Sequence, residues 1–320
     1  MNMLSSFLKT KWYHFVDKYQ KRYVLKTTFV PGIENVSRVD EANRCIMELL
    51  ESENPCMISR YGGTEYYCMI NYMKGCHPLW FLRSLFPFWV NSHITYDMIN
   101  NAGFFPNGNK YFSMFSDLYR KSAREIDILG NWNLYNHAFE EECHYTKFYI
   151  DDIYPFMAKY PWTSALKGKK VLVIHPFKDT IIKQYENRSL LFDNPDILPV
   201  FASLRVVKAV QSLGGESNGF SSWFDALKYM EDEIDKEDYD VAIIGCGAYG
   251  MPLAAHCKRM GKKVVHMGGA TQLLFGIAGD RWLNHFGEAY HKLCSNPHWV
   301  RPSETDRPKN ADKVENACYW

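Results

Sequence analysis

Apolar runs of strand length alternate with amphipathic runs of helical period through the second half of the chain. The predicted strands are residues 169–175, 204–212, 240–245 and 262–266, and the predicted helices include residues 178–188 and 222–234, the second with Ser222 as N-cap. This alternation predicts an α/β fold with a parallel, doubly wound sheet.

The first half contains a similar junction between a strand and a helix. Residues 55–60 form a short apolar run, and helical periodicity is expected from about 64 to 74. The residues at or near the break between them are Arg60, Gly62, Gly63 and Glu65. We therefore predict a strand, a glycine turn and a helix whose first turn carries a carboxylate.

The remaining patterns divide the chain into three parts. Residues 1–54 are predicted to be an N-terminal helical segment, residues 55–295 the α/β domain, and residues 296–320 a tail rich in Pro, Asn and charge. Within the domain, residues 77–160 are dense in aromatic side chains and mostly helical in pattern, with a helix also expected over 37–53 before it. We interpret residues 77–160 as an insertion or cap.

Composition limits the classes of function. The chain is 47% hydrophobic and 23% charged, which is typical of a folded protein with a large core. Its formal net charge of +1 gives no field that would attract nucleic acid, so we expect no nucleic-acid partner. The 9 cysteines form no CxxC pair, which favours reduced thiols in a cytoplasm. Cys246 is the only cysteine that we consider as a reactive group.

Two patterns bear on membranes. No stretch approaches the ~20 apolar residues of a membrane span, and no signal peptide is recognised at the start. Residues 1–32 mix basic with apolar side chains, as in an amphipathic helix that rests on an anionic surface. A helix that covers the domain or a dimer partner is the favoured alternative. We expect a cytoplasmic protein, with peripheral contact at the inner membrane face left open.

The strand near residue 240 ends in a glycine turn. Gly245, Gly247 and Gly250 lead into a helix, and such turns present main-chain N–H groups and a helix dipole to phosphate. The signal is weak alone, because glycine also allows close packing of helix and sheet. The next strand ends at His266, where dinucleotide enzymes carry an acid. An NAD-type oxidoreductase therefore loses its main support but stays an alternative.

Residues that follow parallel strands meet at one edge of the sheet. We therefore expect Arg60, Glu65, His175 and Lys178 to share a cleft with the glycine turn. Cations, imidazoles and main-chain donors in one cleft match a diphosphate ligand better than an apolar one. Structural roles stay open for each: an ion pair for Arg60, a core position for the histidine, and a solvated helix face for the lysine.

Three segments together carry a family resemblance. Residues 59–65, 240–254 and 266–269 resemble bacterial glycosyltransferases of the GT-D fold, and the likeness spans roughly 55–282. The resemblance implies a Rossmann-like domain that transfers a sugar from a nucleotide-diphosphate donor to a glycan or glycoconjugate hydroxyl in surface-polysaccharide biosynthesis. It also implies a divalent ion, Mn or Mg, that assists departure of the diphosphate.

The chain departs from the family in its metal motif. The family's Arg-aromatic-Gly run continues into Asp-x-Glu, and here Glu65 keeps the glutamate while Gly63 stands at the aspartate. Glu65 is then either the remaining metal ligand or the base for the acceptor hydroxyl, and an inactive sugar-nucleotide-binding scaffold is a further alternative. The expected catalytic residues are Glu65 and Arg60, and the expected nucleotide-sugar-binding residues are Gly62, Gly63, His175, Lys178, Arg188, Gly245, Gly247, Tyr249, Gly250, His266 and Gly268.

Overall fold

The computed structural model describes residues 38–72, 92–131, 143–284 and 287–307. These residues form a seven-stranded sheet, in the order β3-β2-β1-β7-β6-β4-β5, with parallel pairing throughout. The strands are β1 Cys56–Arg60, β2 Ile128–Asn131, β3 Thr146–Tyr149, β4 Lys170–His175, β5 Ser203–Lys208, β6 Val241–Ile244 and β7 Lys263–His266. The predicted α/β, Rossmann-like fold is confirmed.

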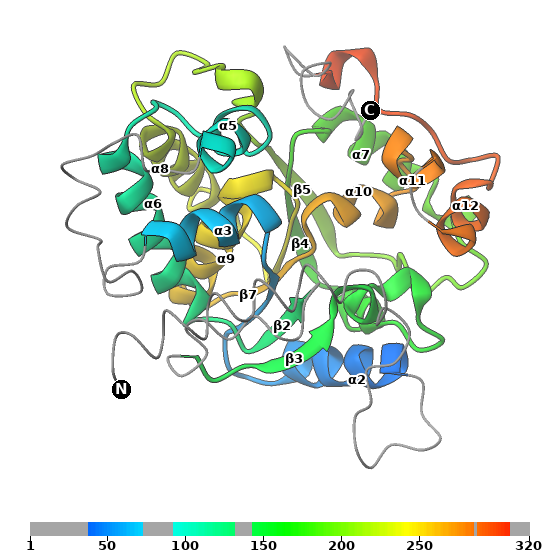
Figure 1. The fold of residues 1–320 in the computed structure, drawn as a ribbon. Coiled ribbons are helices and arrows are strands. Elements are labelled where there is room, and N and C mark those ends of the chain that lie inside the picture. Colours follow the sequence, from blue (N-terminus) through cyan, green and yellow to red (C-terminus); the bar gives the residue numbers. More distant parts are fainter. Residues whose placement is uncertain (1–37, 73–91, 132–142, 285–286, 308–320) are drawn as a thin grey trace.

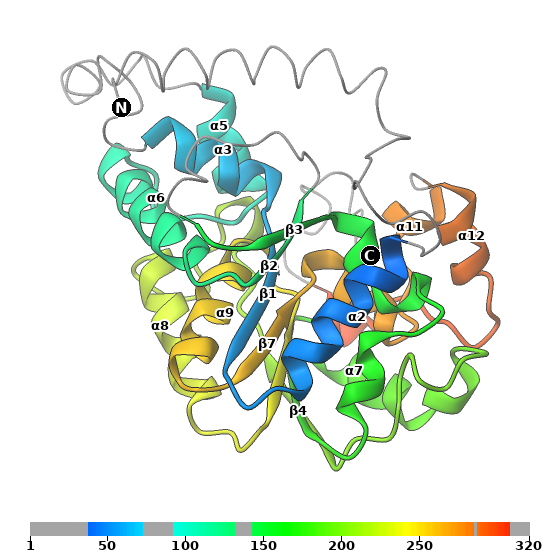
Figure 2. The ribbon, with the colours of Figure 1, turned by 90° about the horizontal axis from the view of Figure 1, so that it is seen from below.

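Helices cover both faces of the sheet, as Figure 1 shows. The helices on one face are α3 Gly63–Tyr72, α5 Ser92–Asn100, α6 Asn109–Ala123, α8 Trp223–Ile234 and α9 Gly250–Arg259. Those on the other face are α2 Arg38–Glu51, α7 Lys178–Glu186, α10 Thr271–Leu274, α11 Asp280–Asn284 and α12 Glu288–Cys294. Figure 2 shows α2 and α7 on one side of the sheet and α6, α8 and α9 on the other.

The strands are apolar along most of their length because both faces are covered. Met57 and Leu172 point into the core beneath α3, α6, α8 and α9, and their neighbours Ile58 and Val173 point into the opposite core. All four side chains are fully buried, and each such burial stabilises the fold by roughly 1.5–3 kcal/mol. This double burial explains why the strands lack a polar alternation in the sequence.

The segment 77–160 is only partly helical. It contains α5 and α6, as expected, but also β2 and β3, which extend the sheet beyond β1. Both strands have 4 residues, and a run of that length shows no period that separates strand from helix. The prediction of a mostly helical segment therefore missed an edge of the sheet. Residues 77–91 and 132–142 of the segment lie outside the described part.

Helix caps agree with the sequence at one helix and differ at another. The Ser222 hydroxyl caps α8 by accepting the Asp225 N–H at 3.3 Å, as predicted. Asp and Thr are residue types favoured at N-caps, but in α7 Asp179 and Thr180 are the second and third helical residues, and the side chain of the N-cap residue makes no capping bond. The strand predicted to reach residue 212 ends at Lys208.

Part of the predicted tail docks onto the domain. Val300 forms a parallel bridge with Ile277, and Trp299 is buried. In the described part of the chain, no helix is long and apolar enough to cross a membrane. Residues 1–37, with the predicted basic amphipathic segment, and residues 308–320 lie outside that part, so contact with a membrane surface stays a prediction.

Candidate functional site

The strand order makes several neighbouring connections leave the sheet on opposite faces, and two of these places involve β7. The chain leaves β1 for α3 on one face of the sheet and leaves β7 for α10 on the other, although β1 and β7 are adjacent (Figures 1 and 2). It also leaves β6 for α9 on the α3 side. In open α/β sheets, ligands bind outside the carboxyl ends of strands at such a switch point. The ends of β1, β7 and β6 are therefore the place to examine.

Arg60 meets the loop after β7 at this edge. Its guanidinium donates to the Tyr61 carbonyl oxygen from Nε at 3.1 Å and from Nη2 at 2.8 Å. Nη1 lies 2.6 Å from the point that a Cβ on Gly268 would occupy, and Gly268 has φ +61°. Only glycine fits both the left-handed backbone and the space left by the guanidinium. The expected approach of Arg60 to the second half of the chain is confirmed.

The three glycines of the turn after β6 have different structural roles. A Cβ on Gly245 would lie 2.6 Å from the Gly268 carbonyl oxygen and from Cβ of Thr271, so this glycine allows the loops after β6 and β7 to touch. A Cβ on Gly250 would overlap the His266 ring. Gly247, in contrast, is exposed, has φ +59°, and has no atom within 4 Å of an added Cβ. The turn is therefore packed at its two ends and open at its middle.

The open turn lies at a helix N-terminus. A short 3-10 helix, η8 Gly247–Tyr249, runs directly into α9. The first N–H groups of a helix have no acceptor within it, and the helix dipole makes this end attractive to anions. The main-chain geometry that the sequence predicted for a phosphate is present at Gly247.

His266 is a buried neutral imidazole. Its Nδ1 lies 2.9 Å from the Ser59 hydroxyl oxygen, and the residue is 4% exposed. Burial, and to a smaller extent the nearby positive charge of Arg60, lower the pKa of His266 to about 3. The ring is therefore neutral at physiological pH and offers one donor and one acceptor nitrogen.

Glu65 folds back over the turn that precedes its own helix. Its carboxylate occupies the space beside Gly62, where a Cβ would overlap it. The Gly62 N–H donates at 3.1 Å to the hydroxyl of Tyr119, which comes from α6. Burial raises the pKa of Glu65, although its own backbone N–H and the Arg60 charge act in the opposite direction. A carboxyl group in this state releases and accepts protons closer to neutral pH than an exposed one.

The junction after β4 is already occupied by a carboxylate of the chain. Asp306, whose side chain is buried, accepts from Thr180 N at 2.9 Å and from Thr180 Oγ1 at 2.7 Å, in the first turn of α7. His175 accepts the Phe177 N–H through Nδ1 at 3.1 Å, and burial lowers the pKa of His175 to about 3. In this structure the Nδ1 atom of His175 stabilises the turn between β4 and α7, and its expected contribution to a ligand site stays a prediction.

Lys178 is the first residue of α7 and is half-buried. It starts the helix whose first turn accommodates Asp306, so it stays at the carboxyl edge of the sheet, beside β6 rather than β1. Its expected role in holding a diphosphate stays a prediction.

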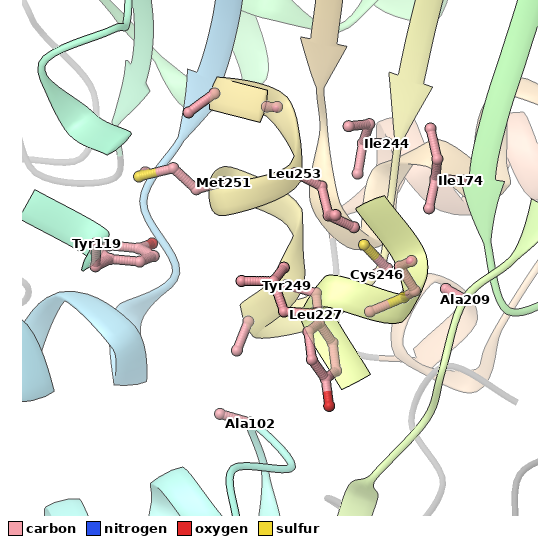
Figure 3. Packing of buried hydrophobic residues seen from close by; sticks show 14 of the residues in the cluster. Ala102, Tyr119, Ile174, Ala209, Leu227, Ile244, Cys246, Tyr249, Met251 and Leu253 are labelled. Carbon is pink, nitrogen blue, oxygen red and sulfur yellow. The ribbon is translucent and has the colours of Figure 1, made fainter. Parts of the chain in front are cut away.

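Two other expected site residues lie elsewhere. Arg188 follows the end of α7, which runs back from the site edge by about 1.5 Å per residue, and its guanidinium lies 5.1 Å from the Tyr185 ring centroid. Tyr249 is 2% exposed, donates or accepts at 2.8 Å with Ser212 Oγ, and stacks on Trp223 with ring centroids 4.6 Å apart. Figure 3 shows Tyr249 within the apolar cluster. The structure therefore places Arg188 beyond the far end of α7 and the Tyr249 side chain in the core, and the binding roles expected for both stay predictions.

Cys246 is a core residue. It is 8% exposed, belongs to the apolar cluster drawn in Figure 3, and burial raises the pKa of its thiol. A thiol in that state is not a nucleophile at neutral pH. The structure therefore favours a packing role for Cys246 over a reactive one.

The described residues do not form a metal centre at this edge. Across the parts of the chain that the structure describes, no group of three His, Cys, Asp or Glu side chains is placed to hold an ion. Gly63, at the position of the family's aspartate, is exposed with open space around it, and Glu65 turns toward its own helix. A lone buried carboxylate does not fit Mn or Mg, which take several oxygen ligands. The expected divalent ion stays a prediction for which the described residues offer no site.

Three residues of this edge were missed by sequence reasoning. Ser59 pairs with a residue 207 positions later, Tyr119 reaches the β1 to α3 turn from α6, and Asp306 comes from the predicted tail. Tyr119 and Asp306 stand in no recognised motif, and Ser59 begins the segment 59–65 without any local sign of its partner. In comparisons with family models, curated proteins and solved structures, no match to this chain was found.

Proposed function

We propose that this chain is a glycosyltransferase that moves a sugar from a nucleotide-diphosphate donor to a glycan or glycoconjugate hydroxyl in surface-polysaccharide biosynthesis. The observation that carries the proposal is the contact of Arg60 with Gly268 in the loop after β7, which in turn touches the β6 turn at Gly245, next to the part of that turn that is open at Gly247. A fixed cation next to free helix N-terminal amides is the environment that a diphosphate needs. The GT-D resemblance of residues 59–65 and 240–254 supports the same reading.

In the proposed transfer, negative charge develops on the leaving nucleoside diphosphate, which would be bound by Arg60 and the main-chain amides at Gly247. The acceptor oxygen attacks the anomeric carbon, the bond from that carbon to the phosphate oxygen breaks, and its electron pair stays on the nucleoside diphosphate. Arg60 and the main-chain amides at Gly247 stabilise that developing charge. Stabilisation of the leaving group lowers the barrier more than equal binding of substrate and transition state would.

Glu65 takes the proton of the acceptor hydroxyl in this proposal. Because burial raises its pKa, its carboxylate is a stronger base than an exposed one, and the neighbouring Arg60 keeps the ionised form accessible. The Tyr119 hydroxyl holds the Gly62 N–H and thereby the turn on which the carboxylate rests. This assignment makes Glu65 a base, and it assigns no step to a metal ion.

Calorimetric titration with UDP and other nucleoside diphosphates, with and without manganese, tests the proposal. Removal of one charge-assisted contact by Arg60→Ala is expected to weaken binding by about 10- to 100-fold. Arg205→Ala is the matched control, because Arg205 is exposed on β5 at the far edge of the sheet. A wild-type chain that binds no nucleoside diphosphate, or an Arg60→Ala variant that binds as Arg205→Ala does, would contradict the proposal.

A sugar-nucleotide-binding scaffold without turnover is the second candidate. It is favoured by the exposed Gly63 and by the lack of a second acidic ligand near Glu65 in the described residues. Nucleotide binding without donor hydrolysis or transfer would select it. The NAD-type alternative is not favoured, because the end of β7 carries a buried neutral His266 where a ribose-binding acid is needed. NADH fluorescence enhancement on mixing would revive it.

A further inference from the structure

Ser59 and His266 form a buried polar pair beneath the candidate site. They lie on the adjacent strands β1 and β7, with Ser59 Oγ 2.9 Å from His266 Nδ1, and both side chains are at least nine-tenths buried. Buried polar side chains are almost always hydrogen-bonded, because an unpaired one destabilises the fold. The pair therefore fixes one edge of the imidazole ring.

The contact favours one tautomer of the imidazole. Within the described part of the chain, the Ser59 hydroxyl makes no other side-chain hydrogen bond. If Nδ1 carried the proton, the Ser59 hydroxyl would accept it and its own hydrogen would lack an acceptor at a fully buried position. If Ser59 donates to Nδ1, that hydrogen is satisfied, and the ring proton is on Nε2.

The other ring nitrogen points at the first turn of α9. A Cβ on Gly250 would overlap Nε2, so the ring edge lies against the helix start that follows the open turn. Nε2 makes no hydrogen bond to any of the described residues. A buried ring at a helix N-terminus, whose remaining donor has no partner among the described residues, is suited to an anion there.

We propose that Ser59 is a positioning residue that holds His266 as the Nε2–H tautomer, so that this N–H joins the main-chain amides at Gly247 in binding a diphosphate. The inference rests on the proposed function and adds a neutral imidazole donor to the site. Neutrality suits the position, because a second cation beside Arg60 would cost energy in a buried environment. Donors fixed before the ligand arrives lose little conformational freedom on binding.

Nitrogen NMR of histidine-labelled protein tests the tautomer without any ligand. The His266 ring resonances are identified by their absence in His266→Gln. We expect protonated Nε2 and unprotonated Nδ1 in the wild type, and a mixture of tautomers in Ser59→Ala, while Ser59→Thr keeps the wild-type signature because it keeps the hydroxyl. A wild-type ring protonated at Nδ1, or a single unchanged tautomer in Ser59→Ala, would overturn the inference.

Calorimetry with inorganic pyrophosphate and UDP tests the donor. His266→Gln keeps an N–H near the position of Nε2, whereas His266→Asn keeps a polar group only near Nδ1. We expect His266→Asn and Ser59→Ala to weaken binding by about three- to tenfold, the size of one hydrogen bond, and His266→Gln to weaken it less. His256→Asn is the control, because His256 pairs with Asp235 in the last turn of α9.

The outcomes separate the two proposals. Binding by the wild type together with equal losses in His266→Asn and His266→Gln would overturn the donor role and leave the glycosyltransferase proposal intact. A wild-type chain that binds neither pyrophosphate nor UDP would overturn both.

Discussion

Replacement of Asp306 by alanine should destabilise the fold more than replacement of an exposed acidic residue by alanine, because Asp306 anchors the C-terminal segment to α7. The carboxylate accepts from Thr180 N at 2.9 Å and from Thr180 Oγ1 at 2.7 Å, and Ser303 Oγ donates to it at 3.3 Å. Thr180 is the third residue of α7, so Asp306 performs the work of an N-cap from 126 residues away. Its removal leaves a buried main-chain N–H and a buried hydroxyl without this acceptor.

The expected loss follows from these contacts. An N-cap contributes about 1 kcal/mol, and a hydrogen bond to a charged group contributes roughly 1.5–3 kcal/mol. Because the bonds share one acceptor and do not add fully, we expect Asp306→Ala to lower the free energy of unfolding by about 2–4 kcal/mol. With about 2 °C per kcal/mol for a chain of this size, Tm should fall by about 4–8 °C. Asp306→Asn keeps one acceptor and should lose about half as much.

Urea and thermal unfolding, followed by circular dichroism, measure the effect. Asp179→Ala is the matched control, because Asp179 is an exposed acid in the same first turn and contributes only through the helix dipole, about 0.3–1 kcal/mol. An Asp306→Ala variant that is no less stable than Asp179→Ala would refute the claim that this carboxylate caps α7.

Three further outcomes are expected. Gly250→Ala should lower the unfolding free energy by about 1–3 kcal/mol in urea, because the new methyl group displaces the His266 ring, whereas Gly287→Ala, with open space around it, should change it little. Glu65→Gln should bind nucleotide without turnover. The folded pKa of Glu65 is raised, so the protonated carboxyl stabilises the fold at low pH and this contribution is lost as pH rises through that pKa. The difference in Tm between Glu65→Gln and wild type should therefore be more favourable to the variant at pH 8 than at pH 4. His175, with a folded pKa of about 3 and an ordinary value of about 6.5, stabilises the fold above that ordinary value and loses this contribution as pH falls toward 3. His175→Asn should therefore reduce the decline in urea-unfolding free energy between pH 7 and pH 4 by up to about 1.4 kcal/mol per pH unit, and an unchanged slope would contradict the assignment.

The sequence predicted the parts of the site that depend on chain direction alone. Because parallel strands end at one edge, Arg60, Gly245 and Gly268 could be brought together from their places after apolar runs. The structure confirms that meeting. Arg188 lies beyond the end of α7, and a helix of that length places the residue after it far from the carboxyl edge of the sheet.

The contacts that the sequence could not supply come from distant segments. Tyr249 was expected to bind the ligand, but its ring stacks on Trp223 in the core and its hydroxyl pairs with Ser212, and no motif marks either partner. Asp306 is likewise unmarked by a motif, because its role is to accept a hydrogen bond from Thr180 in α7, 126 residues earlier in the sequence. Local sequence patterns predict the backbone position of a residue, whereas its side-chain contacts depend on the packing of distant segments.

The interior position of β1 in the sheet, between β2 and β7, has a consequence for how the chain folds during synthesis. Its hydrogen-bonded neighbour β7 is synthesised some 200 residues later, as the 207-residue separation of Ser59 and His266 shows. A nascent chain that stops short of β7 has one side of β1 unpaired, and an exposed strand edge invites association with other chains. Fragments ending before residue 263 should therefore aggregate, and the candidate site is completed only late in translation, when the two halves of the polypeptide close on each other.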